Sequence, residues 1–289
     1  MAGIRIFVVT GANKGIGYGI VKGLGEQASN AVIYLTARDE TRGKNALHQI
    51  SEELGNKKKA EIRFQQLDVT DKDSIRRLAT FLKKEHDGLD VLVNNAGFAY
   101  KTNATESAEV QARDTIAVNY EGVKNVCDAL IPIMRNGGRI VNVCSQMGLL
   151  DGIYKQEIIN TLTKSDLTVS EIDQFCQNYI RACEKGNRRE QGYPESAYRV
   201  SKAAAVALTM VLHRQLKDRH IVVNACCPGY VNTDMTSHKG SLTIEEGADT
   251  PVYLATLESD EPNGQFIYLR KPIDWATHRL KLIMCTKKP

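Results

Sequence analysis

The stretch Thr10-Gly11-Ala12-Asn13-Lys14-Gly15-Ile16-Gly17 decides the fold, and we call it the glycine loop. It follows the apolar segment 4–9, which is typical of a strand, and precedes residues 19–24, which can begin a helix. A strand, a glycine turn and a helix N-terminus in that order form a cradle for phosphate. Gly11 permits the tight turn, Gly15 leaves room for a pyrophosphate to approach the backbone, and Gly17 lets the helix pack closely on the strand.

The composition favours one domain over residues 1–289, because 7 prolines and 22 glycines show no linker-like enrichment. A net charge of +4 is too weak and dispersed to predict a nucleic-acid partner. The seven cysteines form no C-x-x-C pair and match no histidine spacing, so we expect neither a metal site nor a disulfide framework. No apolar run reaches about 18 residues, so no membrane span is predicted, and the cytoplasm is the expected location.

Short β-branched runs alternate with helix-like segments along the chain. The runs that we expect to be strands are 4–9, 31–36, 61–67, 90–93, 138–143 and 221–225. Between them, residues 43–54 and 72–84 carry apolar side chains at helical spacing, with Asp71 or Thr70 available as a cap. Repeated βαβ units predict an α/β fold, a single Rossmann-type doubly wound parallel sheet of about seven strands with helices on both faces.

The end of the second expected strand bears on the choice of cofactor. An NAD site places an acid there for the ribose 2′-hydroxyl, whereas the 2′-phosphate of NADPH needs positive charge. Here the strand ends in Arg38, Arg42 follows four residues later, and Lys14 lies in the glycine loop. Each alone could be a solvated surface charge, but three together predict NADPH.

Two further strand ends carry polar residues. Asp68 and Val69 end the third strand, and Asn94-Asn95-Ala96-Gly97 ends the fourth. Both lie on the carboxyl edge of the expected sheet, where open α/β sheets bind ligands. A short acid at Asp68 can accept a hydrogen bond from an adenine amino group. The Asn-Asn-Ala-Gly run could equally be a plain turn.

Candidate catalytic residues lie at Tyr198 and Lys202, which are four apart and would share one face of a helix. The ammonium can then help the phenol to donate a proton to a carbonyl oxygen. Ser145 follows the strand 138–143 and brings a hydroxyl to the same sheet edge, where it can bond the substrate carbonyl. The alternative for the pair alone is a half-buried tyrosine beside a surface lysine.

These motifs resemble the classical short-chain dehydrogenase/reductase family over nearly the whole chain. Besides the glycine loop, 94–97, Ser145 and 198–202, the resemblance rests on Asn119 and on Pro228-Gly229 with Val231 and Thr233. It implies that Tyr198 is the general acid, that Lys202 binds the nicotinamide ribose and tunes the tyrosine, and that Ser145 orients the carbonyl. Asn119 would support a water-linked proton relay.

The resemblance also implies two sets of contact residues. Those expected to bind the cofactor are Gly11, Asn13, Lys14, Gly15, Ile16, Gly17, Arg38, Arg42, Asp68, Val69, Asn95, Ala96, Gly97, Tyr198, Lys202, Pro228, Gly229, Val231 and Thr233. Those expected to face the substrate are Ser145, Met147, Tyr198 and Tyr230.

The chain between Ser145 and Tyr198 is much longer than in most members of that family, through an insertion at about 150–193. Thr168-Val169-Ser170-Glu171 reads as a capping box, and the helix expected over 170–185 carries the apolar stripe Ile172, Phe175, Cys176, Tyr179 and Ile180. With this insertion, the run Cys226-Cys227-Pro228-Gly229 and the run 35–39, the chain resembles the monomeric NADPH-dependent cytosolic carbonyl reductases of animals, in which the insertion covers the surface that other members use to oligomerise. The resemblance therefore implies a monomer with a small-molecule carbonyl substrate.

The predicted activity is NADPH-dependent reduction of ketones, quinones or aldehydes to alcohols. An alternative is a hydroxy-dehydrogenase specific for a steroid, prostaglandin or ecdysteroid on the same site. The glycine spacing argues against a sugar epimerase or dehydratase, and the filled catalytic positions argue against a non-catalytic NADP(H) sensor. Cys227 can be a small buried residue or a reactive thiol, and the resemblance favours the reactive thiol.

Overall fold

The computed structural model describes residues 3–278, so the C-terminal stretch from residue 279, with Cys285, lies outside the described residues. Eight strands form one sheet in the order β3-β2-β1-β4-β5-β6-β7-β8, all parallel except the last pair. The strands are β1 (Arg5–Val9), β2 (Ala31–Ala37), β3 (Glu61–Gln66), β4 (Leu89–Asn94), β5 (Met134–Val143), β6 (Val222–Cys227), β7 (Phe266–Tyr268) and β8 (Lys271–Pro272). This confirms the Rossmann-type fold, with eight strands rather than about seven. The assignment of a single domain over 1–289 stays a prediction.

The central strands are buried on both faces, as a parallel sheet covered by helices requires. Along β1, Ile6 and Val8 belong to one hydrophobic core, whereas Phe7 and Val9 belong to the other. Every residue of β2 is buried. The period-two alternation of side chains therefore feeds two separate cores, one on each side of the sheet.

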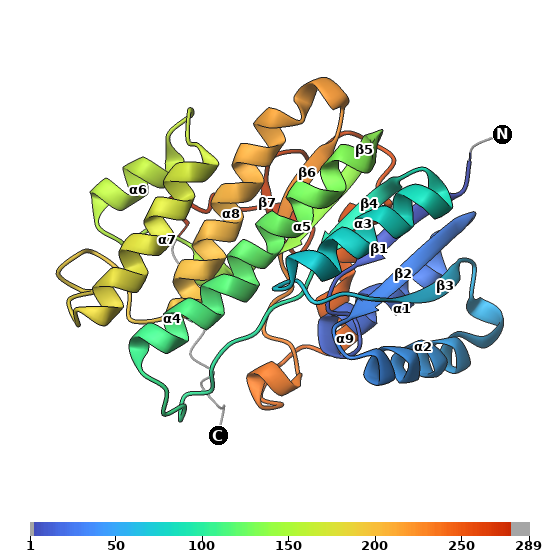
Figure 1. The fold of residues 1–289 in the computed structure, drawn as a ribbon, viewed down its shortest axis with the longest axis horizontal. Coiled ribbons are helices and arrows are strands. Elements are labelled where there is room, and N and C mark those ends of the chain that lie inside the picture. The colour runs from blue at the N-terminus through green and yellow to red at the C-terminus, as the bar shows by residue number, and fades with distance from the viewer. Residues whose placement is uncertain (1–2, 279–289) are drawn as a thin grey trace.

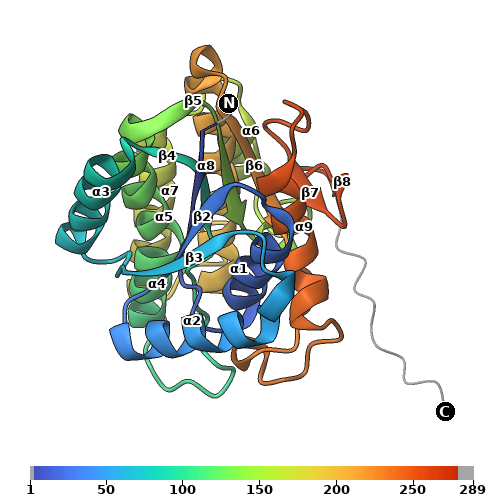
Figure 2. The same ribbon diagram turned by 90° about the vertical axis from the view of Figure 1, so that its right-hand side faces the viewer.

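Helices cover both faces, and Figures 1 and 2 show the two layers. One face carries α1 (Gly15–Gln27), α2 (Glu40–Leu54) and α9 (Ile244–Thr256), and the other carries α3 (Lys72–His86), α4 (Ala108–Ile116), α5 (Gly122–Leu130) and α8 (Ala197–Gln215). Asp71 is the N-cap of α3, one of the two predicted caps. No helix within residues 3–278 has the length and apolar character needed to cross a membrane.

The insertion folds as α6 (Gln156–Thr163) and α7 (Val169–Glu184). The predicted capping box of Thr168 and Glu171 begins α7, and the predicted apolar stripe is buried. α7 packs against α4 and α8. Asp173 on α7 accepts hydrogen bonds from the Tyr120 hydroxyl at 2.8 Å and from Lys124 Nζ at 2.8 and 2.9 Å. The insertion therefore covers the helical face that includes the helix with Tyr198 and Lys202.

Candidate active site

The glycine loop has the backbone geometry that its sequence predicts. Gly11 and Gly15 have φ of +62° and +57°, a region that favours glycine. A Cβ built on Gly11 would lie 2.8 Å from Ala96 Cα, and one on Gly17 would lie 2.4 Å from Asn95 Nδ2 and 2.5 Å from the Gly11 carbonyl oxygen. Gly17 thus allows close packing against the turn and Asn95, rather than against the strand. Any side chain at Gly11 or Gly17 would displace the loop.

Hydrogen bonds lock this loop to the end of β4. The buried Thr10 Oγ1 accepts from the backbone N–H groups of Asn95 at 3.0 Å and Ala96 at 2.9 Å. In return, Asn95 Nδ2 donates to the carbonyl oxygens of Thr10 and Gly11, both at 3.0 Å. The segment 94–97 is therefore a connector between two strand ends rather than a plain turn. Thr10 was not among the expected binding residues.

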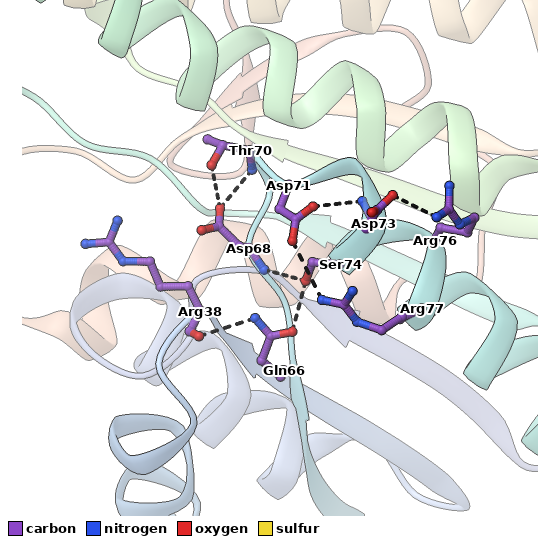
Figure 3. A network of polar contacts seen from close by, with 9 residues as sticks. All are labelled: Arg38, Gln66, Asp68, Thr70, Asp71, Asp73, Ser74, Arg76 and Arg77. Carbon is purple, nitrogen blue, oxygen red and sulfur yellow. Dashed lines mark hydrogen bonds and ion pairs between the residues drawn. The ribbon is translucent and has the colours of Figure 1, made fainter.

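The three cations predicted to favour NADPH, Lys14, Arg38 and Arg42, are exposed, and they differ in their ion-pair partners. Lys14 Nζ forms an ion pair with Asp234 Oδ2 at 2.6 Å. Arg42 Nε lies 3.9 Å from Asp39 Oδ2, and Asp39 is also the N-cap of α2. The Arg38 guanidinium has no hydrogen bond or ion pair among residues 3–278, and it extends away from the neighbouring polar network (Figure 3).

That network joins the ends of β2 and β3 (Figure 3). Gln66 Nε2 donates to the Arg38 carbonyl oxygen at 3.3 Å, and Ser74 Oγ donates to Gln66 Oε1 at 2.9 Å. The Asp68 N–H in turn donates to Ser74 Oγ, and Asp68 Oδ1 accepts from the backbone and hydroxyl of Thr70. Asp68 is thus held in place on the edge where the adenine was predicted. Neighbouring Val69 packs on α5, since a Cβ on Gly122 would lie 2.9 Å from its Cγ2.

Tyr198 and Lys202 lie on one face of α8, as their spacing predicts. Lys202 is only 6% exposed, and its Nζ donates to the Val143 carbonyl oxygen at 2.9 Å. The same Nζ lies 5.7 Å from the centroid of the half-buried Tyr198 ring. A surface lysine is therefore excluded, and the ammonium lies in a low-dielectric position close to the phenol.

Asn119 lies in a π-helical turn, Ala117–Glu121, between α4 and α5. Such turns are frequent at functional sites. Its fully buried side chain accepts from the Phe98 N–H and donates to the Phe98 carbonyl oxygen, both at 2.9 Å, and it donates to Ser201 Oγ at 3.0 Å. A Cβ on Gly97 would lie 3.0 Å from Asn119 Oδ1 and 3.6 Å from Lys202 Nζ. The end of β4, the π turn and α8 therefore meet at one point.

Ser145 follows β5 after Cys144 and caps a short 3₁₀ turn, Gln146–Gly148. Its Oγ accepts from the Met147 N–H at 3.1 Å. A Cβ on Gly148 would lie 2.8 Å from the Lys202 carbonyl carbon and 2.9 Å from the Ala203 nitrogen. The turn that holds Ser145 thus rests on the backbone of α8 at Lys202, a contact that nothing in the sequence but a glycine indicates.

The segment after β6 folds over the glycine loop. Gly229 has a φ of +85°, Val231 is buried, and Thr233 Cγ2 would lie 3.4 Å from a Cβ built on Gly15. Of these predicted residues, Thr233 is thereby brought beside Gly15 of the cradle. Tyr230, which was predicted to face the substrate, is 54% exposed.

Cys227 is 4% exposed, and this burial weighs against the reactive thiol, which stays a prediction. Burial raises the pKa of its thiol, which disfavours the nucleophilic thiolate. Its Sγ accepts from the backbone N–H groups of Gln146 at 3.3 Å and Gly229 at 3.4 Å. Cys227 is therefore a small buried residue that joins two loops of the site.

The chain resembles known proteins over most of its length. A family model described as short chain dehydrogenase matches residues 5–156 and 186–242, and thus skips most of α6 and α7. The chain is 43% identical over 271 residues to carbonyl reductase (NADPH) 3 of Mus musculus, covering 91% of this chain and 95% of that protein. It is 40% identical over 281 residues to carbonyl reductase (NADPH) 1 of Homo sapiens, covering 95% and 99%. The solved structure of salutaridine reductase from Papaver somniferum superposes with a TM-score of 0.81 at 33% identity, covering 91% and 99%.

Proposed function

The chain belongs to the short chain dehydrogenase family, and we propose that it reduces ketones, quinones or aldehydes at the sheet edge where Tyr198 and Ser145 lie. It is an NADP-dependent oxidoreductase that resembles the animal carbonyl reductases. The observation that carries the proposed chemistry is the buried Lys202 ammonium, 5.7 Å from the ring of Tyr198.

The residues of the cradle fit the NADPH that the family implies. At Gly11 and Gly17 a side chain would collide with the loop, and Arg38, Arg42 and Lys14 supply positive charge for a 2′-phosphate. We assign the remaining contacts to the predicted residues Asn13, Gly15, Ile16, Asp68, Val69, Asn95, Ala96, Gly97, Pro228, Gly229, Val231 and Thr233. When bound, NADPH supplies the hydride.

In the proposed mechanism Tyr198 donates its phenolic proton to the carbonyl oxygen of the substrate. Lys202 would favour the phenolate that remains, because its buried ammonium lies close to the Tyr198 ring. Ser145 Oγ accepts from the Met147 N–H, so its own hydrogen can be donated to the same carbonyl oxygen. The two hydroxyls would hold and polarise the carbonyl group.

Asn119 has the supporting role in this proposal. Its three side-chain hydrogen bonds fix the π turn against Phe98 and against Ser201 on α8. In a π turn the backbone ladder is irregular, so a backbone carbonyl can accept from water and begin a proton relay toward Lys202. Met147 and Tyr230 would contact the rest of the substrate.

We further propose that the protein is a monomer. The stripe on α7 is buried against α4 and α8, and the bonds of Asp173 to Tyr120 and Lys124 tie the insertion down. That face is therefore occupied within the chain, in a segment that the family model does not match.

The proposed activity is tested by incubating the purified protein with a simple quinone and following the loss of NADPH absorbance, with NADH in parallel. We expect consumption that depends on the quinone and is much faster with NADPH. No consumption with quinone, ketone and aldehyde probes would reject the proposed reaction.

A further inference from the structure

Asp234 lies beside the glycine loop and contacts three basic residues, Lys14, Lys101 and His238. It begins a 3₁₀ turn, Asp234–Thr236, directly after Thr233. Its Oδ2 lies 2.6 Å from Lys14 Nζ and its Oδ1 lies 3.1 Å from His238 Nε2. Lys101 donates to the Asp234 carbonyl oxygen and, at 3.0 Å, to Ser237 Oγ.

These contacts join three segments that are far apart in the sequence. Lys14 belongs to the glycine loop, Lys101 to the connection after β4, and Asp234 to the connection after β6. The latter two connections lie beside each other at the same end of the molecule in Figures 1 and 2. Thr233 next to Asp234 lies against Gly15. A carboxylate is therefore held beside the backbone that forms the phosphate cradle.

A carboxylate in this place works against the binding of phosphate. Like charges repel, and the one cation that the glycine loop contributes is already paired with Asp234. The side chains of Lys14 and Asp234 are 63% and 58% exposed. Ion pairs that exposed contribute little free energy, so a dianionic phosphate can displace the carboxylate from the ammonium, at some cost in affinity.

We propose that Asp234 is a specificity-determining residue, whose carboxylate competes with the 2′-phosphate of NADPH for Lys14 and so limits the preference for NADPH over NADH. This inference rests on the proposed function, because it takes Lys14 as a ligand of the 2′-phosphate. Arg38, which has no ion pair among the described residues, keeps the preference for NADPH in place.

The test is equilibrium binding of NADPH and NADH to Asp234→Asn, followed by cofactor fluorescence. The amide keeps the shape of the side chain and removes its charge. We expect the Kd for NADPH to fall roughly three- to tenfold and the Kd for NADH to change less than about twofold. Asp249→Asn is the matched control, because Asp249 is an exposed carboxylate paired with Arg270 away from the glycine loop, and both Kd values should stay unchanged.

Lys14→Met separates this inference from the proposed function. It should weaken NADPH binding and leave NADH binding unchanged, and adding Asp234→Asn to it should tighten NADPH binding less than the same change does in the wild type. If Lys14→Met weakens NADPH but Asp234→Asn does not tighten it, or tightens NADH equally, the competition is refuted and the cofactor site stands. If Lys14→Met leaves the NADPH Kd unchanged, the proposed role of Lys14 fails, and the competition fails with it.

Discussion

Gly148→Ala should slow catalysis without disturbing the cofactor site. An added Cβ would lie 2.8 Å from the Lys202 carbonyl carbon and 2.9 Å from the Ala203 nitrogen. Ordinary contacts of this kind begin at 3.4 Å, so about 0.6 Å of movement is needed. Both atoms belong to the backbone of the buried helix α8, whereas the turn that carries Ser145 is half-buried. The turn should therefore move and carry the Ser145 hydroxyl away from the carbonyl.

A shift of that size at a group that positions the substrate lowers kcat by about 10- to 100-fold. The assay is steady-state reduction of a quinone, together with the NADPH Kd, which should change less than twofold, and the Tm. Gly23→Ala is the matched control, because its Cβ would lie 2.9 Å from Val252 Cγ2 between α1 and α9 on the other face of the sheet. It should lower Tm and leave kcat within about twofold. A Gly148→Ala enzyme with wild-type kcat would refute the positioning of Ser145 by this contact.

Three further predictions concern the cofactor, the thiol and the insertion. Arg38→Asp should raise the KM for NADPH far more than that for NADH, and equal effects on both would reject the assignment of Arg38 to the 2′-phosphate. When the native protein is treated with iodoacetamide at pH 7, peptide mapping should show little alkylation of Cys227. Labelling should increase as the pH rises, because burial raises the pKa of the thiol. Rapid labelling at pH 7 would contradict the assignment of Cys227 as a buried, unreactive thiol. Light scattering should give a mass near 32.1 kDa, and deletion of residues 155–190 should give dimers or aggregates; a full-length dimer would overturn the monomer proposal.

The sequence predicted those elements whose signal is local. β-branched runs between glycine turns located six strands, and the caps at Asp71 and Thr168 located two helix starts. β5 begins at Met134 rather than at 138, because Arg-Asn-Gly-Gly carries no strand pattern and lies at an irregularity between the pairs Leu89–Met134 and Val91–Arg139. β7 and β8 were not located because three and two residues are too short to show a period.

In the site too, residues with a local sequence signal could be predicted, whereas contacts between distant segments could not. The glycine loop and the Tyr198–Lys202 pair were visible in the sequence because each lies within one short segment. Thr10 bonds to Asn95 across 85 positions and Lys14 pairs with Asp234 across 220, so their roles appear only once the chain is folded. The burial of Cys227 likewise appears only in the folded chain, since sequence neighbours do not report burial.

The proposed reaction depends most on Tyr198 as the general acid, and Tyr198→Phe tests that role directly. The phenylalanine keeps the ring beside Lys202 and removes only the hydroxyl. We predict that kcat for quinone reduction falls by ~100-fold or more, while the Kd for NADPH stays within about twofold of the wild type. A Tyr198→Phe enzyme that keeps more than about a hundredth of the wild-type kcat would contradict the proposed mechanism.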